Sequence, residues 1–147
     1  MKYWHATLFI SIFLTAFTNN TFWATVISRL NGSADTLFLL SLFVVIILLT
    51  HSLVSLISFH WLLKPAVILL LIASASAAYF MDQYTVMIDR EMIVNVFETD
   101  FREAGEYFNL TFLFKLILLG ILPAYLVYRI PLIYPDSLWQ GLWQRTL

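Results

Sequence analysis

Residues 36–59 read TLFLLSLFVVIILLTHSLVSLISF and contain no aspartate, glutamate, lysine or arginine. His51 is the one titratable group in this stretch. A helix needs roughly 20 consecutive apolar residues to cross the hydrocarbon core of a bilayer, which is about 30 Å thick. Residues 36–59 therefore predict a membrane-spanning helix.

Two further runs of sufficient length lie on either side of it, at residues 5–28 and 62–81. The first is uncharged but includes Asn19 and Asn20, and the second contains the small-residue stretch 73–78. Small residues let two helices approach closely in lipid, where no hydrophobic force holds them together. We therefore expect the small-residue stretch to lie at a helix contact.

A fourth run covers residues 110–128 and carries Lys115 near its beginning and Pro123 within it. The long aliphatic stem of a lysine can stay in the apolar layer while its ammonium reaches the interface, and we expect Lys115 to do so. Together the four runs predict an all-α membrane protein with a bundle of four transmembrane helices. A polar segment at residues 82–109 separates the last two.

The composition supports a membrane protein and excludes two other classes. Hydrophobic residues make up 61% of the 147 residues and charged residues 12%, whereas soluble domains average about 45–50% and 25%. A disordered chain would be poor in aliphatic residues, and eight Lys and Arg against nine Asp and Glu provide no basic surface for nucleic acid. The chain has no cysteine, so a disulfide or thiolate metal site is excluded.

Lysine and arginine residues in short loops set the orientation of a membrane protein. The count is nearly balanced: the four spans place Arg29, Arg90 and Arg102 on one side, with Lys115 close to its border. The other side holds Lys2, Lys64, Arg129 and Arg145. This imbalance favours a cytoplasmic N-terminus. Segment 82–109, with seven of the nine acidic residues, then faces away from the cytoplasm.

Residues 91–108 have the periodicity of an amphipathic helix, with phenylalanines on one side and polar residues on the other. Asn95, Thr99 and Glu103 follow one another at intervals of four, which stacks an amide, a hydroxyl and a carboxylate one turn apart. Such a ladder can hold a cationic, hydrogen-bonding head group. The alternative is an interfacial helix that needs a polar face for contact with water, and periodicity alone favours that interpretation.

The residues of this segment resemble the membrane domain of bacterial lipid A phosphoethanolamine transferases, the family that includes the mobile colistin resistance enzymes. The resemblance extends over essentially the whole chain. It rests on the Asn pair late in the first run, Lys64-Pro65, Tyr79-Phe80-Met81, Tyr84, Val86, Ile88-Asp89-Arg90, Met92-Ile93, Asn95, Thr99, Glu103-Ala104 and Gly120-Ile121-Leu122-Pro123-Ala124.

The resemblance implies a multi-pass enzyme of the bacterial inner membrane with segment 82–109 on the periplasmic side. In this family a bundle of five transmembrane helices precedes a periplasmic α/β domain. There a zinc-bound threonine takes phosphoethanolamine from phosphatidylethanolamine and passes it to lipid A, which protects the cell against polymyxins. The resemblance also implies that Asn95, Thr99 and Glu103 bind the donor lipid. Glu103 would pair with the ammonium, and the other two would hydrogen-bond the phosphate or glycerol region.

The sequence departs from the family pattern at Leu147, where the family continues into a fifth span and its catalytic domain. We therefore expect this chain to hold no catalytic residue and no cofactor, because the zinc site belongs to the catalytic domain; His5, His51 and His60 are too scattered to form one. One alternative is a stand-alone small membrane protein that binds lipid or a separately encoded partner subunit. The acceptor also stays open between lipid A and a core sugar.

Overall fold

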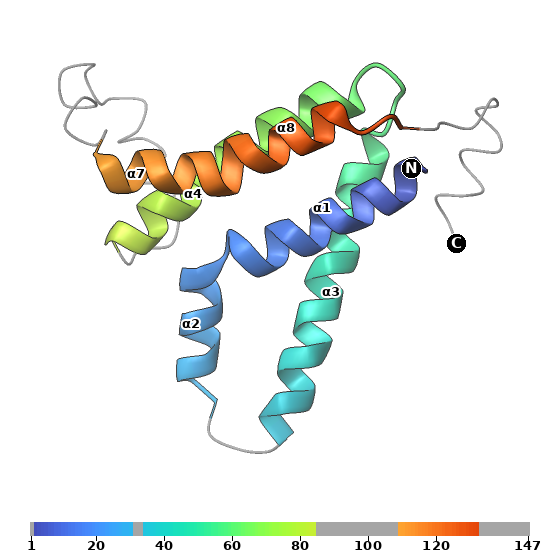
Figure 1. Ribbon diagram of the computed structural model, residues 1–147. Coiled ribbons are helices and arrows are strands. Elements are labelled where there is room, and N and C mark those ends of the chain that lie inside the picture. Colours follow the sequence, from blue (N-terminus) through green and yellow to red (C-terminus); the bar gives the residue numbers. More distant parts are fainter. Residues whose placement is uncertain (1, 31–33, 85–108, 133–147) are drawn as a thin grey trace.

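The computed structural model describes residues 2–30, 34–84 and 109–132, which Figure 1 draws as coloured ribbons. These residues form helices joined by short loops, which confirms the predicted all-α class. In chain order the helices are α1 (Tyr3–Phe17), α2 (Asn20–Ser28), α3 (Ala34–Leu56), α4 (Leu63–Tyr84), α7 (Leu110–Lys115), the π-helix η1 (Leu116–Ile121) and α8 (Leu122–Arg129).

Three stretches of helix among the described residues are long and apolar enough to cross a membrane. They are Asp35–Leu56 in α3, Leu63–Gln83 in α4, and Leu110–Arg129 in the continuous helix formed by α7, η1 and α8. The pair α1 and α2 raises this number to four if it forms one span. The amphipathic segment predicted at residues 82–109 falls, from residue 85 to residue 108, outside the described residues.

The run predicted as one span, residues 5–28, is divided into α1 and α2, which meet at a bend of 58°. At the break, the Leu14 carbonyl accepts hydrogen bonds from Thr18 Oγ1 at 2.7 Å and Asn19 Nδ2 at 2.9 Å. The Trp23 indole reaches back to donate to the Thr15 carbonyl at 2.8 Å. Carbonyls at a helix end need partners because lipid provides none. These side chains therefore stabilise a break that a run of apolar residues does not predict.

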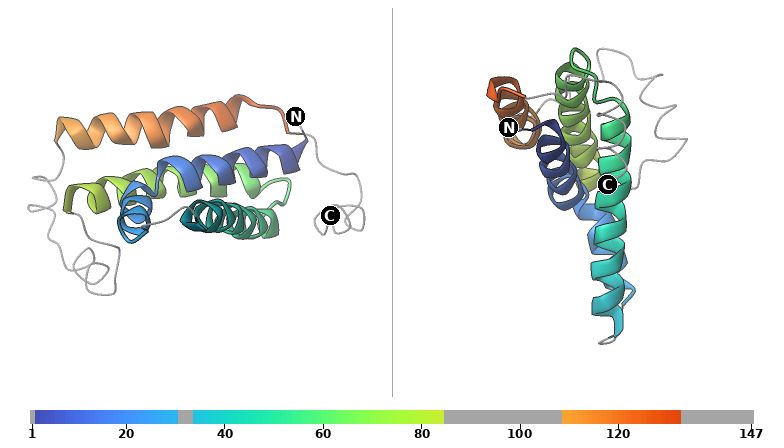
Figure 2. Two further views of the ribbon diagram at one scale, coloured as in Figure 1. Left: turned by 90° about the horizontal axis from the view of Figure 1, so that it is seen from below. Right: turned by 90° about the vertical axis from the view of Figure 1, so that its right-hand side faces the viewer.

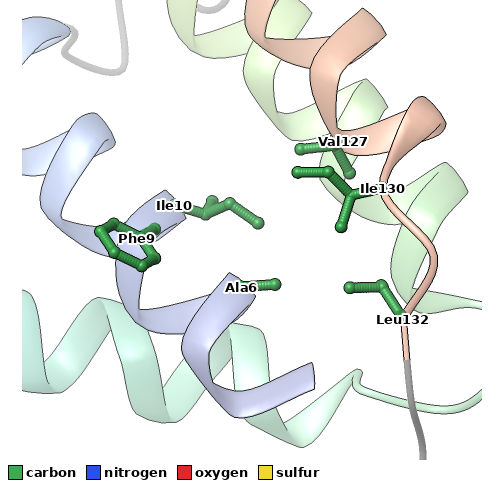
Figure 3. A pocket seen from close by; sticks show the side chains of 6 residues that line it. All are labelled: Ala6, Phe9, Ile10, Val127, Ile130 and Leu132. Carbon is green, nitrogen blue, oxygen red and sulfur yellow. The ribbon is translucent and has the colours of Figure 1, made fainter. Parts of the chain in front are cut away.

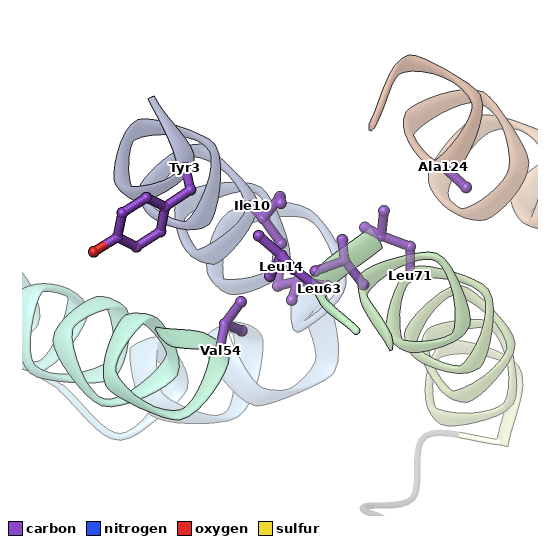
Figure 4. Packing of buried hydrophobic residues seen from close by; sticks show 8 residues of the cluster. Tyr3, Ile10, Leu14, Val54, Leu63, Leu71 and Ala124 are labelled. Carbon is purple, nitrogen blue, oxygen red and sulfur yellow. The ribbon is translucent and has the colours of Figure 1, made fainter. Parts of the chain in front are cut away.

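The helices pack in two sets of contacts. The first helix packs against α3, while α4 packs against the continuous helix from α7 to α8 and also contacts α2. In Figures 1 and 2, the axes of α1, α4 and the continuous helix from α7 to α8 are similarly inclined, with the chain in α7–α8 running opposite to that in α4, whereas α3 crosses them. Ile10 and Leu14 of α1, Val54 of α3 and Leu63 of α4 belong to one buried cluster (Figure 4).

A π-turn in the last helix places a glycine against α4. Pro123 has no N–H, and its ring would collide with the carbonyl of residue 119 in a regular α-helix. The wider turn avoids this collision, and the Leu122 N–H donates to the Ile117 carbonyl. Within the turn, a Cβ atom added to Gly120 would lie 3.1 Å from the Ala75 Cβ. The small-residue stretch 73–78 thus contains the closest contact to this glycine, as the sequence predicts.

We predict that Gly120→Val lowers the free energy of unfolding by about 1–3 kcal/mol, because the added methyl groups force α4 and η1 apart. Unfolding in detergent micelles, followed by circular dichroism, measures the change. Leu118→Val, at a half-exposed position of the same turn, is the matched control. Combining Gly120→Val with Ala75→Gly tests the contact, and strictly additive effects of the two substitutions would contradict it.

Candidate functional site

The sequence-predicted binding residues Asn95, Thr99 and Glu103 lie outside the described residues. Their arrangement as a ladder therefore stays a prediction. The structure instead describes the two helices between which this segment runs, the end of α4 and the start of α7. Polar side chains from these two helices and from α2 meet at one end of the bundle, and we call this group, Thr21, Tyr79, Asp82, Asn109 and Lys115, the polar junction.

An aspartate at the end of α4 forms the charged part of the polar junction. The Lys115 Nζ lies 2.7 Å from Asp82 Oδ2, and the side chains are 30% and 20% exposed. The hydroxyl of Thr21 donates to the other carboxylate oxygen, Oδ1, at 2.7 Å. The three residues come from the bent first pair of helices, from α4 and from α7. One carboxylate thus joins three helices that are far apart in the sequence.

A neutral hydrogen-bond chain forms the second part of the polar junction. The Asn109 side chain accepts a hydrogen bond from the Phe112 N–H at 2.8 Å, which caps the start of α7. Its amide nitrogen donates to the Tyr79 hydroxyl oxygen at 2.7 Å. The ring of Phe112 packs edge-on against that of Tyr79, with centroids 5.0 Å apart. Asn109 therefore both caps the start of α7 and fixes this helix to α4.

The two parts of the polar junction differ in how far the sequence predicts them. The sequence predicts that Lys115 extends to the interface, and the structure adds a partner for its ammonium, the Asp82 carboxylate on the neighbouring helix. The signal for this pair is one acid and one base at the adjoining ends of two consecutive spans. Sequence reasoning assigned no role to Asn109, although an asparagine directly before an apolar run is a typical helix N-cap.

The opposite end of the bundle carries basic residues. The Lys64 ammonium donates to the Tyr128 carbonyl at 3.0 Å, which joins the start of α4 to the end of α8. Lys2 directly precedes α1 and Arg129 ends α8, and Figure 1 shows the beginning of α1 and the end of α8 at the same end. The described part of the chain thus has a basic end and, away from it, the polar junction.

Near the basic end, a small pocket lies between α1 and the end of α8 (Figure 3). Its lining side chains are all apolar: Ala6, Phe9, Ile10, Val127, Ile130 and Leu132. An apolar lining offers no acid, base or ligand for chemistry, so we place the candidate site at the polar junction.

The described residues were also compared with the requirements of the zinc ion that the family resemblance implies for the catalytic domain. A zinc site needs three or four histidine, cysteine or carboxylate ligands close together. Within residues 2–30, 34–84 and 109–132, no three such side chains are grouped. The described residues therefore do not fit a zinc ion.

We predict that Asn109→Ala lowers the free energy of unfolding by about 1–2 kcal/mol, because it removes both the helix cap and the bond to Tyr79. Asn109→Ser keeps a capping oxygen and is expected to recover part of the loss. A double-mutant cycle with Tyr79→Phe, measured by unfolding in micelles, isolates the bond between the two side chains. A coupling energy of zero would contradict the hydrogen bond.

Comparison with known proteins adds independent information. Residues 43–147 match the family described as Phosphoethanolamine transferase EptA/EptB. The chain is 35% identical over 139 residues to the phosphatidylethanolamine transferase Mcr-2 of Escherichia coli, covering 94% of this chain and 26% of Mcr-2. It is 39% identical over 130 residues to Mcr-1 of the same organism, covering 86% of this chain and 24% of Mcr-1.

A solved structure has the same fold. The integral membrane protein lipooligosaccharide phosphoethanolamine transferase A (EptA) from Neisseria meningitidis superposes with a TM-score of 0.87 and 22% identity. The match covers 95% of this chain and 26% of that protein. The chain therefore spans about a quarter of the length of the relatives that it matches.

Proposed function

The chain belongs to the phosphoethanolamine transferase EptA/EptB family, and on that premise we propose that it presents the donor lipid in a phosphoethanolamine transferase of the bacterial inner membrane. The donor is phosphatidylethanolamine, the substrate in the names of Mcr-1 and Mcr-2. The acceptor is a phosphate of lipid A, whose modification makes the surface less negative and weakens the attraction of polymyxins. The transfer of phosphoethanolamine is carried out by the part of the enzyme that corresponds to the unmatched three quarters of Mcr-2.

The head group binds to Asn95, Thr99 and Glu103. Phosphatidylethanolamine has an ammonium and a phosphate, so its site needs a carboxylate for the first and hydrogen-bond donors for the second. Glu103 pairs with the ammonium, and Asn95 and Thr99 donate to the phosphate or glycerol oxygens. A helix over residues 91–108 would place all three on one face.

The single observation that carries this proposal is the location of the polar junction between the two helices that the binding segment connects. The Asn109 bond to Tyr79 and the Lys115 pair with Asp82 bring the start of α7 against the end of α4. The two described residues that flank residues 85–108, Tyr84 and Asn109, therefore lie at the same end of the bundle.

The orientation follows from the basic end. Lysine and arginine favour the cytoplasmic side, so Lys2, Lys64 and Arg129 support an orientation with the N-terminus inside and the polar junction in the periplasm. This requires four membrane crossings, with α1 and α2 acting as one bent span. Figure 1 supports the arrangement, because the end of α4 and the start of α7 lie on the same side of the bundle, away from the start of α1.

We predict that the purified chain retains phosphatidylethanolamine in preference to phosphatidylcholine, and that Glu103→Gln reduces this preference by about tenfold. Loss of one charge-assisted hydrogen bond is worth about 1.5–3 kcal/mol, which is sufficient for a change of this size. Native mass spectrometry with equimolar mixtures of the two lipids measures the preference. Choline carries three methyl groups in place of the three N–H hydrogens of ethanolamine, so it cannot donate a hydrogen bond to Glu103.

Glu98→Gln is the matched control, since it makes the same change of charge five residues away, and on a helix over residues 91–108 Glu98 lies well away from Glu103. The proposed site predicts that this control binds as the wild type does. Equal losses in Glu103→Gln and Glu98→Gln would show that the acidic segment acts only through its total charge. A wild-type chain without any preference would contradict donor binding.

A further inference from the structure

Two basic residues border the small apolar pocket between α1 and the end of α8. Lys2 directly precedes α1, and its carbonyl accepts a hydrogen bond from the N–H of Ala6, which lines the pocket. Arg129 ends α8 and directly precedes Ile130, another lining residue. Figure 3 shows the lining side chains of α1 on one side of the pocket and those from the end of α8 on the other. Each of the two chain segments that form the pocket therefore carries a cation beside it.

The acidic residues of the described part of the chain lie away from these two cations. This part contains two acids, Asp35 and Asp82. Asp35 lies in the first turn of α3 and Asp82 near the end of α4, and Figure 1 shows both of these helix ends away from the start of α1. The side chains of Lys2 and Arg129 are exposed. The described residues thus leave a positive charge at this end that a ligand of opposite charge can neutralise.

The guanidinium of Arg129 has an aromatic neighbour and keeps its hydrogen-bond donors. Its central carbon lies 5.8 Å from the centre of the Tyr125 ring, within the range of a cation–π contact. Contact with the face of a ring uses none of the five N–H donors of the group. A guanidinium with free donors is well suited to bind a phosphate, often through two parallel hydrogen bonds.

The cations and the pocket together match the chemistry of a phospholipid. Arg129 ends the membrane span Leu110–Arg129, and basic side chains at such a position reach the level of the lipid head groups. The pocket itself is lined by apolar side chains only, so it accepts hydrocarbon. An extended peptide would bring backbone N–H and carbonyl groups for which this lining offers no partner. A small soluble anion would leave the pocket unused.

We propose that this end of the molecule binds an anionic phospholipid, with part of one acyl chain in the apolar pocket and the phosphate held by Lys2 and Arg129. The site is separate from the polar junction and does not depend on the proposed function. In the orientation proposed above it faces the cytoplasmic leaflet, where basic pockets between helices bind acidic head groups. The bound lipid connects α1 to α8.

The first test measures the charge preference of the full 147-residue chain in neutral detergent by native mass spectrometry. The probes are phosphatidylglycerol and phosphatidylcholine with identical acyl chains, which differ in net charge. We expect the wild type to retain phosphatidylglycerol preferentially. Lys2→Gln and Arg129→Gln are each expected to reduce this preference by about fivefold, the usual effect of one basic side chain near an anionic surface. A wild-type chain without this preference would overturn the proposal.

Arg29→Gln is the matched control, because Arg29 is an exposed arginine at the end of another helix, α2. It makes the same change of charge away from the pocket, and we expect it to bind as the wild type does. Equal losses in Arg29→Gln and Arg129→Gln would show that anionic lipid responds only to total charge, which would overturn the site.

The second test locates the acyl chain with a phosphatidylglycerol that carries a photoreactive diazirine on one chain. Ile10 lines the pocket and is 7% exposed, so lipid that only surrounds the protein does not reach it. We expect the label on Ile10, and we expect unlabelled phosphatidylglycerol to compete for it more strongly than phosphatidylcholine. Ile130→Phe, which fills the pocket, is expected to remove this label. Leu126→Phe, at a half-exposed position outside the lining, is expected to keep it.

The remaining outcomes identify other occupants of the pocket. An unlabelled Ile10 in the wild type would mean that residues 133–147, a second copy or nothing at all fills the pocket, and would overturn the proposal. Displacement of the labelled lipid by glycerol phosphate would show that the head group binds without an acyl chain, and the pocket would then have no part in binding. Equal labelling of Ile10 in Ile130→Phe and the wild type would contradict the placement of the chain.

Discussion

Within a lipid bilayer every carbonyl, N–H and charge must find its partner inside the protein, because the surrounding hydrocarbon offers none. This constraint accounts for the features that depart from straight apolar helices. Asn19 and Trp23 supply donors to the carbonyls released where α1 ends. Asn109 caps the first N–H groups of α7, and Lys115 finds Asp82. Each of these polar side chains thereby becomes a connection between helices or between turns.

Several of these hydrogen bonds and the ion pair lie at one end of α4. Thr21 reaches Asp82 because the first pair of helices bends by 58°. A straight first helix would carry this hydroxyl elsewhere. The bend, the ion pair and the asparagine cap together hold the end of α4 against the start of α7.

Sequence reasoning predicts the helices well because uncharged runs of about 20 residues have one common solution in lipid. It does not predict the bend, although Asn19 and Asn20 are visible, because the break depends on Trp23 folding back to Thr15. The acid and the base of the Asp82–Lys115 pair are visible at the adjoining ends of two consecutive spans, but periodicity describes one helix face and does not say which residues meet between helices. For Asn95, Thr99 and Glu103 the prediction comes from resemblance and spacing, and it lies outside the described residues.

The central claim is that the polar junction lies on the periplasmic side and the basic end on the cytoplasmic side. The chain has no cysteine, so single cysteines can be placed at Gln83, beside the junction, and at Trp61, which is 76% exposed near the basic end. Intact cells are treated with a thiol reagent that reaches the periplasm but does not cross the inner membrane. We expect Gln83→Cys to be labelled in intact cells and Trp61→Cys only after the inner membrane is disrupted. The reverse pattern would contradict the orientation, and with it the presentation of a periplasmic donor head group.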